Sequence, residues 1–291
     1  MSTPNASEKP RRAGGRMLSH AIMALMAAYF LLPFWWLVVA STKDNDDLFN
    51  TAPLWFTSRN EFFDNLRVLF SQGDGIYFIW LQNSAFYSIV CGVGATAVAA
   101  FAGYAFAKLR FPGRNLLFSL LLGLIMVPAT ALVLPTYLLM SRLGLTDTIW
   151  AVILPSLLNP FGVYLLRVYV HDSVPDEMLE AARLDGASEL RVFRSVALPM
   201  MRPALVTVLL FTMVATWNNF FLPLVMLSDD KLYPLTVGLR SWYLAATLGN
   251  AGPALFNVIV TGVLVAIVPL IIAFLLLQRY WRGGLTMGSL R

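Results

Sequence analysis

The chain has 291 residues, of which 58% are apolar and only 13% charged, with a formal net charge of +5. Water-soluble domains usually carry about a quarter charged residues, so this composition indicates a membrane protein. One cysteine and two histidines exclude an intrachain disulfide and a zinc site of the usual kind. The basic residues lie at the ends of apolar segments, so the positive charge does not indicate a nucleic-acid-binding protein.

Six apolar segments are long enough to cross a bilayer, which takes about 20 helical residues. The first, His20–Ala40, is longer than the apolar region of a signal peptide, so we expect a retained span. The other five are Leu81–Ala107, Leu116–Met140, Thr148–Tyr169, Pro203–Leu227 and Ala254–Leu277. The pattern predicts an all-α polytopic membrane protein with six transmembrane helices and both termini on one side.

Loop charge predicts which side that is, because loops rich in Lys and Arg stay in the cytoplasm. With the amino terminus inside, 15 of the 21 Lys and Arg residues fall on inner segments or inner span ends. We therefore expect both termini to be cytoplasmic. Residues 1–19 and 281–291 are the predicted cytoplasmic tails, and residues 20–280 form one transmembrane domain that contains an inner loop of residues 171–202.

The predicted outer loop, Thr42–Trp80, contains a helix signal. Ser58-Arg59-Asn60-Glu61 fits a capping box, in which two side chains bond each other's free backbone N–H groups. Apolar residues follow at helical spacing: Phe62, Phe63, Leu66, Leu69 and Phe70. We expect a short amphipathic helix on the outer surface, where it seals the helical bundle.

The middle of every predicted span lacks Asp, Glu, Lys and Arg. Ion- and proton-coupled carriers usually need a buried ionisable group, and membrane proteases and transferases need catalytic carboxylates, histidines or a metal. None of the four lysines follows a glycine, so the chain has no nucleotide-binding G-x-x-x-x-G-K-[ST] motif. We expect no cofactor on this chain, and ATP-powered transport would need another chain to bind the ATP.

Two features of the spans suggest how they pack. Residues Cys91–Gly103 are almost entirely Gly, Ala, Val and Thr, which lets helices approach closely in lipid. Four asparagines lie at depth, where an unpaired amide costs several kcal/mol. They either pair with other helices or line a wet translocation pathway, and the sequence leaves both open: Asn159, Asn218, Asn219 and Asn257.

The inner loop His171–Arg202 is charged yet periodic. Pro175 can occupy the first position of a helix, and acidic residues follow where the helix dipole favours them. Asp185-Gly186 is expected to end this helix, because glycine suits the left-handed position past a helix end. The expected apolar faces of the two arms are Met178, Leu179, Ala181, Ala182 and Leu184, then Leu190, Phe193, Val196 and Ala197, with Pro199 and Pro203 returning the chain to the membrane. The pattern predicts a helix–turn–helix hairpin, although an inert surface loop remains the alternative.

The loop contains Glu180, Ala181, Ala182, Arg183, Asp185, Gly186 and Ala187, followed by Phe193, Leu198 and Pro199. This pattern resembles the E-A-A-x-x-x-G loop of binding-protein-dependent ABC importer permeases. Further matches run along the chain: Gln82–Ser84, Ala105–Gly113, Trp217–Leu224, Pro234–Leu239, Gln278–Tyr280 and Gly284–Gly288. The first two resemble the family in general, and Trp217–Leu224 and Pro234–Leu239 are typical of its carbohydrate branch. Within that branch the chain, including its two tail matches, resembles the smaller six-span partner in transporters of the maltose type.

The resemblance implies a type I ABC importer permease fold in the cell membrane. The implied partners are a second homologous permease, two copies of an ABC ATPase and an extracytoplasmic solute-binding protein. Glu180 would anchor the loop in an ATPase cleft, Ala181 and Ala182 would allow close approach, and Gly186 would supply the turn. The loop Ser228–Pro253 would face the binding protein, and the tail after Gln278 would contact the ATPase pair. The alternatives are a non-sugar solute, such as a polyol or a glycerol phosphodiester, and an ion-coupled carrier.

Overall fold

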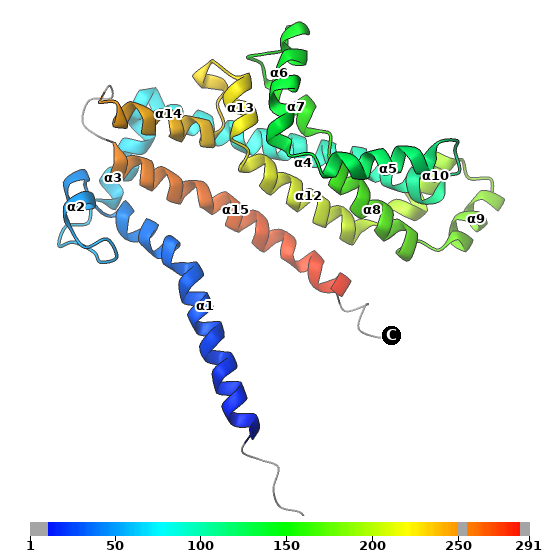
Figure 1. The fold of residues 1–291 in the computed structure, drawn as a ribbon, viewed down its shortest axis with the longest axis horizontal. Coiled ribbons are helices and arrows are strands. Elements are labelled where there is room, and N and C mark those ends of the chain that lie inside the picture. The colour runs from blue at the N-terminus through cyan, green and yellow to red at the C-terminus, as the bar shows by residue number, and fades with distance from the viewer. Residues whose placement is uncertain (1–10, 250–254, 286–291) are drawn as a thin grey trace, which may run out of the picture.

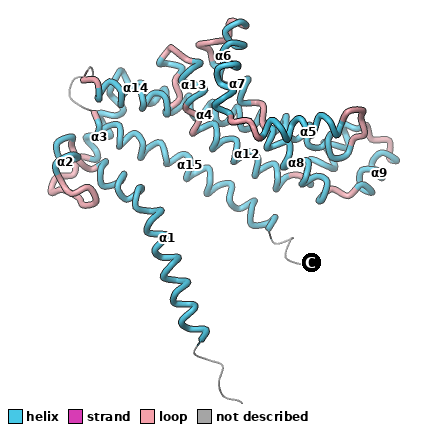
Figure 2. Tube along the Cα trace, in the orientation of Figure 1, coloured by secondary structure: helices cyan, strands magenta, loops and turns pink. Residues whose placement is uncertain are grey.

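The computed structural model describes residues 11–249 and 255–285, and no strand occurs among them. Short loops join the helices (Figure 2). The helices are α1 (Arg11–Ser41), α2 (Asn45–Asn50), α3 (Phe62–Ser71), α4 (Ile76–Lys108), α5 (Arg114–Ile125), α6 (Val133–Arg142), α7 (Ile149–Ser156), α8 (Pro160–Ser173), α9 (Asp176–Leu184), α10 (Glu189–Val192), α11 (Leu198–Met200), α12 (Arg202–Trp217), α13 (Phe221–Met226), α14 (Leu235–Thr247) and α15 (Phe256–Leu285). The 3-10 turns η1 (Gln72–Gly75), η2 (Ala129–Leu132) and η4 (Asp230–Leu232) and the π-helical turn η3 (Phe193–Ala197) complete the set. The all-α prediction is confirmed.

The first and last helices extend beyond the predicted apolar spans. The first helix begins at Arg11, inside the predicted tail, and the last runs to Leu285, past the predicted end of its span at Leu277. Residues 1–10 and 286–291 lie outside the described residues, as does the 250–254 segment at the end of the Ser228–Pro253 loop.

The number of spans depends on how bent helices are counted. Four helical stretches are long and apolar enough to cross a membrane: Met17–Ser41, Phe62–Lys108, Ile149–Ser173 and Phe256–Leu276. Two more count if each bent pair is one span: α5 with Ala129–Arg142, bent by 101°, and Glu189–Met200 with α12, bent by 80°. The predicted third span, Leu116–Met140, is therefore broken near Pro128, and the predicted fifth span is divided between α12 and α13.

The centre of the molecule is built from α4, α8 and α12, with α15 alongside α12 (Figure 1). The hairpin that contains α9 lies at one end of this bundle, and α2, α3 and α14 lie at the other. Helix α1 diverges from α15, and among its residues from Met17 onward the first buried one is Val39. The two ends thus carry the two loops that the charge pattern assigns to opposite sides.

The small residues of α4 allow the close packing that the sequence predicts. A Cβ atom on Gly103 would lie 2.8 Å from the Cβ atom of Leu166 and 3.0 Å from the backbone nitrogen of Arg167, both on α8. A Cβ atom on Gly92 would lie 2.5 Å from the side chain of Met213 on α12. Since lipid gives helices no hydrophobic reason to associate, this proximity supplies the van der Waals contact that holds them together.

The expected capping box at Ser58–Glu61 does not form. Helix α3 begins at Phe62, and its cap residue Glu61 makes no side-chain capping bond. Glu61 is already occupied, because its backbone N–H donates to the Thr42 carbonyl and its carboxylate pairs with Arg59. The Asn60 side chain accepts from the Phe62 N–H instead. The helix itself is amphipathic as predicted, with Leu69 buried, but Phe63 of the predicted apolar set is exposed.

Candidate functional site

The first arm of the hairpin, α9, begins and ends at residues that local chemistry explains. Pro175 precedes the helix as its cap residue, one position earlier than predicted, and Asp176 and Glu177 occupy the first turn. At the other end, Gly186 adopts φ +80°. Its N–H donates to Arg183 O, and the next N–H, of Ala187, donates to Ala182 O, both at 3.0 Å. These two bonds satisfy carbonyls that a helix end leaves free, which confirms the predicted turn at Gly186.

The second arm continues through Pro199 instead of ending there. It comprises α10, the π-helical turn η3 and α11. In an α-helix the ring of Pro199 would clash with the carbonyl four residues earlier, that of Ser195. The wider turn, in which Leu198 N–H donates to Phe193 O, lies directly before the proline. The chain turns back only at Met201, between α11 and α12, so the expected role of Pro199 in the return is corrected.

Buried apolar side chains fix the hairpin to the bundle. Leu179 of the first arm and Val192 and Phe193 of the second belong to one buried cluster with residues of α4 and α8. The Phe193 ring stacks on Phe101, with centroids 4.7 Å apart, and also contacts Tyr104 at 5.1 Å. Phe193 is therefore part of the packing that links the hairpin to α4.

An ion pair joins the two arms of the hairpin. Arg183 Nε lies 2.7 Å from Glu189 Oε1, and the second guanidinium contact to Glu189 Oε2 is 3.3 Å. The hydrogen bond to Glu189 raises the pKa of Arg183 above its ordinary value. Two-point contacts of this kind fix the orientation of both side chains, so the arms are held at a defined angle.

Several predicted apolar-face residues point away from the protein. The exposed fractions are 89% for Leu184, 66% for Leu190 and 49% for Met178. These three members of the predicted apolar faces are therefore exposed, and Leu179 alone of the α9 residues is fully buried. Residues of the E-A-A motif share this outer surface, where Glu180, Ala181, Asp185, Gly186 and Pro199 are exposed, while Ala182 and Leu198 are half-buried. Apolar side chains gathered among charges on a protein surface are typical of a docking site.

Two of the four asparagines pair within the fold. Asn159 caps α8, accepting from Gly162 N–H and donating to Thr212 Oγ1, both at 2.8 Å. Asn257 donates to Asn65 Oδ1 at 2.6 Å. Asn65 in turn donates to the carbonyls of Ser41 and Lys43. For Asn159 and Asn257 the structure therefore favours pairing with other helices over lining a translocation pathway. Asn65 was missed in the sequence, where its only signal is a polar residue on a predicted apolar helix face.

The other two asparagines lie beside a surface hollow. Asn218 is exposed and donates only to the Val214 carbonyl of its own helix. It lines a hollow of about 360 Å³ together with Trp217, Phe220 and Thr236. The carbonyl of Asn219 accepts from Thr236 Oγ1 at 2.8 Å. The Asn218 amide therefore has hydrogen-bonding groups that are not used within the fold, and the rings of Trp217 and Phe220 line the same hollow.

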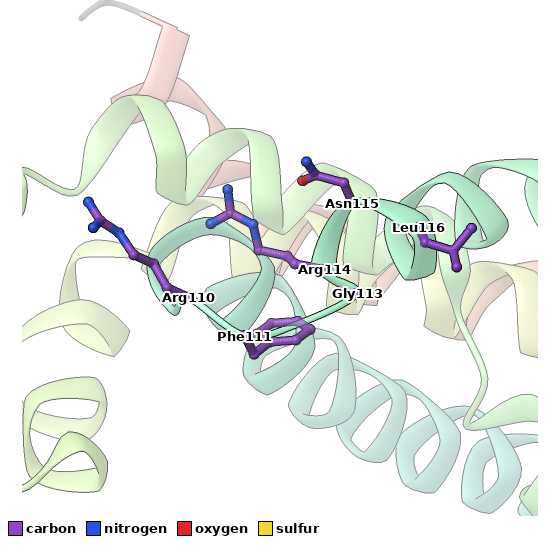
Figure 3. A pocket seen from close by; sticks show the side chains of 6 residues that line it. All are labelled: Arg110, Phe111, Gly113, Arg114, Asn115 and Leu116. Atoms are coloured by element: carbon purple, nitrogen blue, oxygen red, sulfur yellow. The ribbon is translucent and has the colours of Figure 1, made fainter.

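A second hollow, of about 330 Å³, lies at the turn between α4 and α5 (Figure 3). Arg110, Arg114 and Asn115 extend to one side of this turn, and Gly113 opens α5 at φ +78°. Arg114 Nη1 donates to the Leu109 carbonyl at 3.2 Å, which closes the turn on itself. The turn is therefore strongly cationic. Among the described residues of the whole chain, no three or more His, Cys, Asp or Glu side chains come together as a metal site would require.

Asp147, between α6 and α7, joins two loops. Its Oδ1 accepts from the backbone N–H groups of Ser228 and Asp229, at 2.7 and 2.9 Å, and its own N–H donates to Met226 O. Its φ of +59° is one that Asp tolerates better than most residues. The two N–H donors lower the pKa of Asp147 below its ordinary value. This junction fixes the start of the loop that the resemblance assigns to the binding protein.

Replacing Asp147 is expected to loosen this junction. Asp147→Ala loses both acceptors and tolerates the positive φ poorly, whereas Asp147→Asn keeps an acceptor oxygen and the backbone tolerance, so thermal unfolding at pH 7 should rank wild type above Asn above Ala. A lowered pKa stabilises the fold above the ordinary Asp pKa of about 4, and the gain is lost as pH falls through the lowered pKa. The gap between wild type and Asp147→Asn should therefore narrow below about pH 4. A gap that did not change with pH would contradict the role of the charge.

The chain is similar in sequence and fold to known transport proteins. Residues 92–282 match the family described as "Binding-protein-dependent transport system inner membrane component". The arabinooligosaccharide transport permease AraQ of Halalkalibacterium halodurans is 34% identical over 275 residues, covering 94% of this chain and 95% of that protein. The sn-glycerol-3-phosphate transport permease UgpE of Pectobacterium atrosepticum is 29% identical over 278 residues, covering 94% and 97%. A solved bacterial ABC transporter that imports the acidic polysaccharide alginate has a chain with a similar fold, with a TM-score of 0.80 at 24% identity over 96% of this chain and 100% of that one.

Proposed function

Because the chain belongs to the family of binding-protein-dependent transport system inner membrane components, we propose that it forms half of the translocation pathway of an ATP-binding-cassette importer for a carbohydrate. Its partners are a second, homologous permease, two ATPase subunits and an extracytoplasmic solute-binding protein. Both termini lie in the cytoplasm. The chain binds no nucleotide or other cofactor itself, so the ATPase subunits supply all of the hydrolysis.

The hairpin of α9 to α11 is the observation that carries this proposal. Its outer surface combines exposed Leu184 and Leu190 with Glu180, whose carboxylate makes neither a hydrogen bond nor an ion pair to any described residue. These residues dock into the ATPase subunit, with Glu180 as the polar anchor. When the ATPase pair closes, the hairpin moves as a unit because Arg183 and Glu189 tie its arms together. The bend at Met201 and the Phe193 packing pass that movement to α12 and α4.

The proposed solute is an oligosaccharide, as in the relative AraQ. The hollow beside Asn218 suits such a solute, because Trp217 and Phe220 offer apolar faces to sugar rings and the amide offers hydrogen bonds. The second candidate is a glycerol phosphate, which the relative UgpE carries by name. Arg240, whose guanidinium carbon lies 5.5 Å from the Phe220 ring centre, is the cation that would serve it. An ion-coupled carrier is disfavoured by the lack of acidic residues in the middle of the predicted spans.

Reconstitution tests the proposal. The chain is purified with its co-encoded permease, ATPase and binding protein and placed in proteoliposomes with ATP on the ATPase side. We expect uptake of a labelled arabinooligosaccharide that needs both ATP and the binding protein, with sn-glycerol 3-phosphate as the competing solute. Uptake driven by an ion gradient without ATP would contradict the mechanism. Transport of the phosphate ester alone would replace the sugar with the second candidate.

Purified alone, the chain is expected to show no ATP hydrolysis, because it lacks a nucleotide-binding lysine motif. Phosphate release from the isolated chain should equal that of a protein-free blank, while the assembled complex should hydrolyse ATP when the binding protein is added. Turnover that stayed with the isolated chain through repeated purification steps would contradict the assignment of ATP hydrolysis to the partners.

A further inference from the structure

Lys108 is the last residue of α4, and its side chain is only 6% exposed. Its Nζ lies 2.8 Å from Oδ1 of Asp176, the first residue of α9. The two residues are 68 positions apart in the sequence. A lysine with a buried stem directs its ammonium group to a polar partner at the surface, and here that partner belongs to the hairpin.

Helix electrostatics favour this pairing at both ends. A cation is stabilised at the carboxyl end of a helix and an anion at the amino end, and Lys108 and Asp176 occupy those positions on α4 and α9. The hydrogen bond from Lys108, and then its charge, lower the pKa of Asp176 below its ordinary value. Asp176 itself is 70% exposed, so water screens the pair on that side. The packed lysine stem reduces the entropy lost when the ion pair forms.

The backbone between α8 and α9 is not continuously helical, although Val174 itself is buried in the core. Val174 and Pro175 have extended dihedral angles, with ψ of 105° and 137°, so the two helices are separated by a non-helical hinge. The other links of α9, through Leu179 and through Arg183, lead chiefly to the second arm of the hairpin and the shared core. The amino end of α9 therefore has one direct polar tie to the bundle among the described residues, and that tie is Lys108.

We propose that Lys108 is a positioning residue, an ionic strap that makes the amino end of α9 move with α4. This inference rests on the proposed function, because it concerns how the hairpin transmits movement of the ATPase. Without the strap, α9 can swing at the Val174–Pro175 hinge, and part of the ATPase movement is absorbed there. With the strap, the amino end of α9 has its own route to α4, in addition to the Phe193 packing of the second arm and the bend that leads to α12.

The test uses the complete reconstituted complex and measures solute taken up per ATP hydrolysed. Lys108→Met keeps the buried stem and removes the charge, and Asp176→Asn keeps the shape of the exposed partner. Each single substitution should lower the uptake-to-ATP ratio about threefold to fivefold, the effect of losing about 1 kcal/mol of a partly exposed ion pair. The double variant should be no worse than either single variant, because the strap is already absent. Lys108→Arg should retain the wild-type ratio.

Arg110→Met is the matched control, since it removes a charge of the same sign from the neighbouring turn and should leave the ratio unchanged. If Lys108→Met fails to assemble, Asp176→Asn decides alone, because its exposed side chain leaves the core intact. A wild-type ratio in Asp176→Asn, or losses that multiply in the double variant, would overturn the strap. A wild-type complex without ATP-driven uptake would instead overturn the proposed function on which the strap rests.

Discussion

Gly186→Pro is expected to abolish ATP-driven uptake while the chain stays in the membrane. Proline fixes φ near −65°, but Gly186 has φ +80°, and proline lacks the N–H that Gly186 donates to Arg183 O. The turn between the arms cannot form with this residue. The cost is about 3 kcal/mol or more, which lowers the ratio of native to non-native hairpin on the order of 100-fold.

A matched variant distinguishes the effect of breaking the turn from the effect of merely replacing a glycine. Gly186→Asn should retain most of the uptake, because Asn tolerates the left-handed region and a Cβ atom at this position would meet nothing within 4 Å. Uptake and binding-protein-stimulated ATP hydrolysis are measured in proteoliposomes, and the amount of chain in the membrane is measured by immunoblot. Normal stimulated hydrolysis and uptake in Gly186→Pro would show that the turn has no part in coupling.

The turn at Gly186 was predictable because its signals are local. A short acidic-then-apolar run, followed by Asp-Gly, specifies a helix end whatever surrounds it. The small-residue face of α4 was predictable for a similar reason, since a run of Gly and Ala has one common use in a membrane. In both cases residues close together in the sequence determine the feature. The structure has the predicted turn at Gly186 and the predicted close helix contact at Gly103.

The bends in the spans were not predictable from prolines alone. Pro33 and Pro269 lie inside α1 and α15, which continue through them, whereas the chain breaks by 101° next to Pro128. Whether a proline breaks a helix depends on whether neighbouring helices and side chains satisfy the freed carbonyl, which the local sequence does not contain. The same limit applies to the ion pair between Lys108 and Asp176 and to the bond between Asn257 and Asn65, whose partners are distant in sequence.

Gly238→Leu is expected to disrupt the end of the molecule that contains α14. A Cβ atom at Gly238 would lie 2.1 Å from Cδ2 and 2.2 Å from Cε3 of Trp80. Trp80 cannot move aside, because it is fully buried, donates its indole N–H to Asp230 O at 2.8 Å and packs against Trp242. Overpacking of a filled site costs about 1–3 kcal/mol, and a leucine adds far more than one methyl group. We expect a lower unfolding temperature and little assembled complex.

Two further variants test whether the defect comes from a clash with Trp80: a substitution at another glycine, and a second substitution that makes Trp80 smaller. Gly123→Ala in α5 should be tolerated, since nothing lies within 4 Å of its Cβ position, whereas Gly238→Ala should already lower the unfolding temperature. Adding Trp80→Leu to Gly238→Ala should recover part of the loss relative to the sum of the two single effects, because the smaller side chain frees the space that the new methyl group needs. Thermal unfolding of the purified variants measures this coupling. Strictly additive losses would mean that the two sites do not interact. Gly238 would then be needed for the backbone of α14, and its contact with Trp80 would not be what holds α14 on α4.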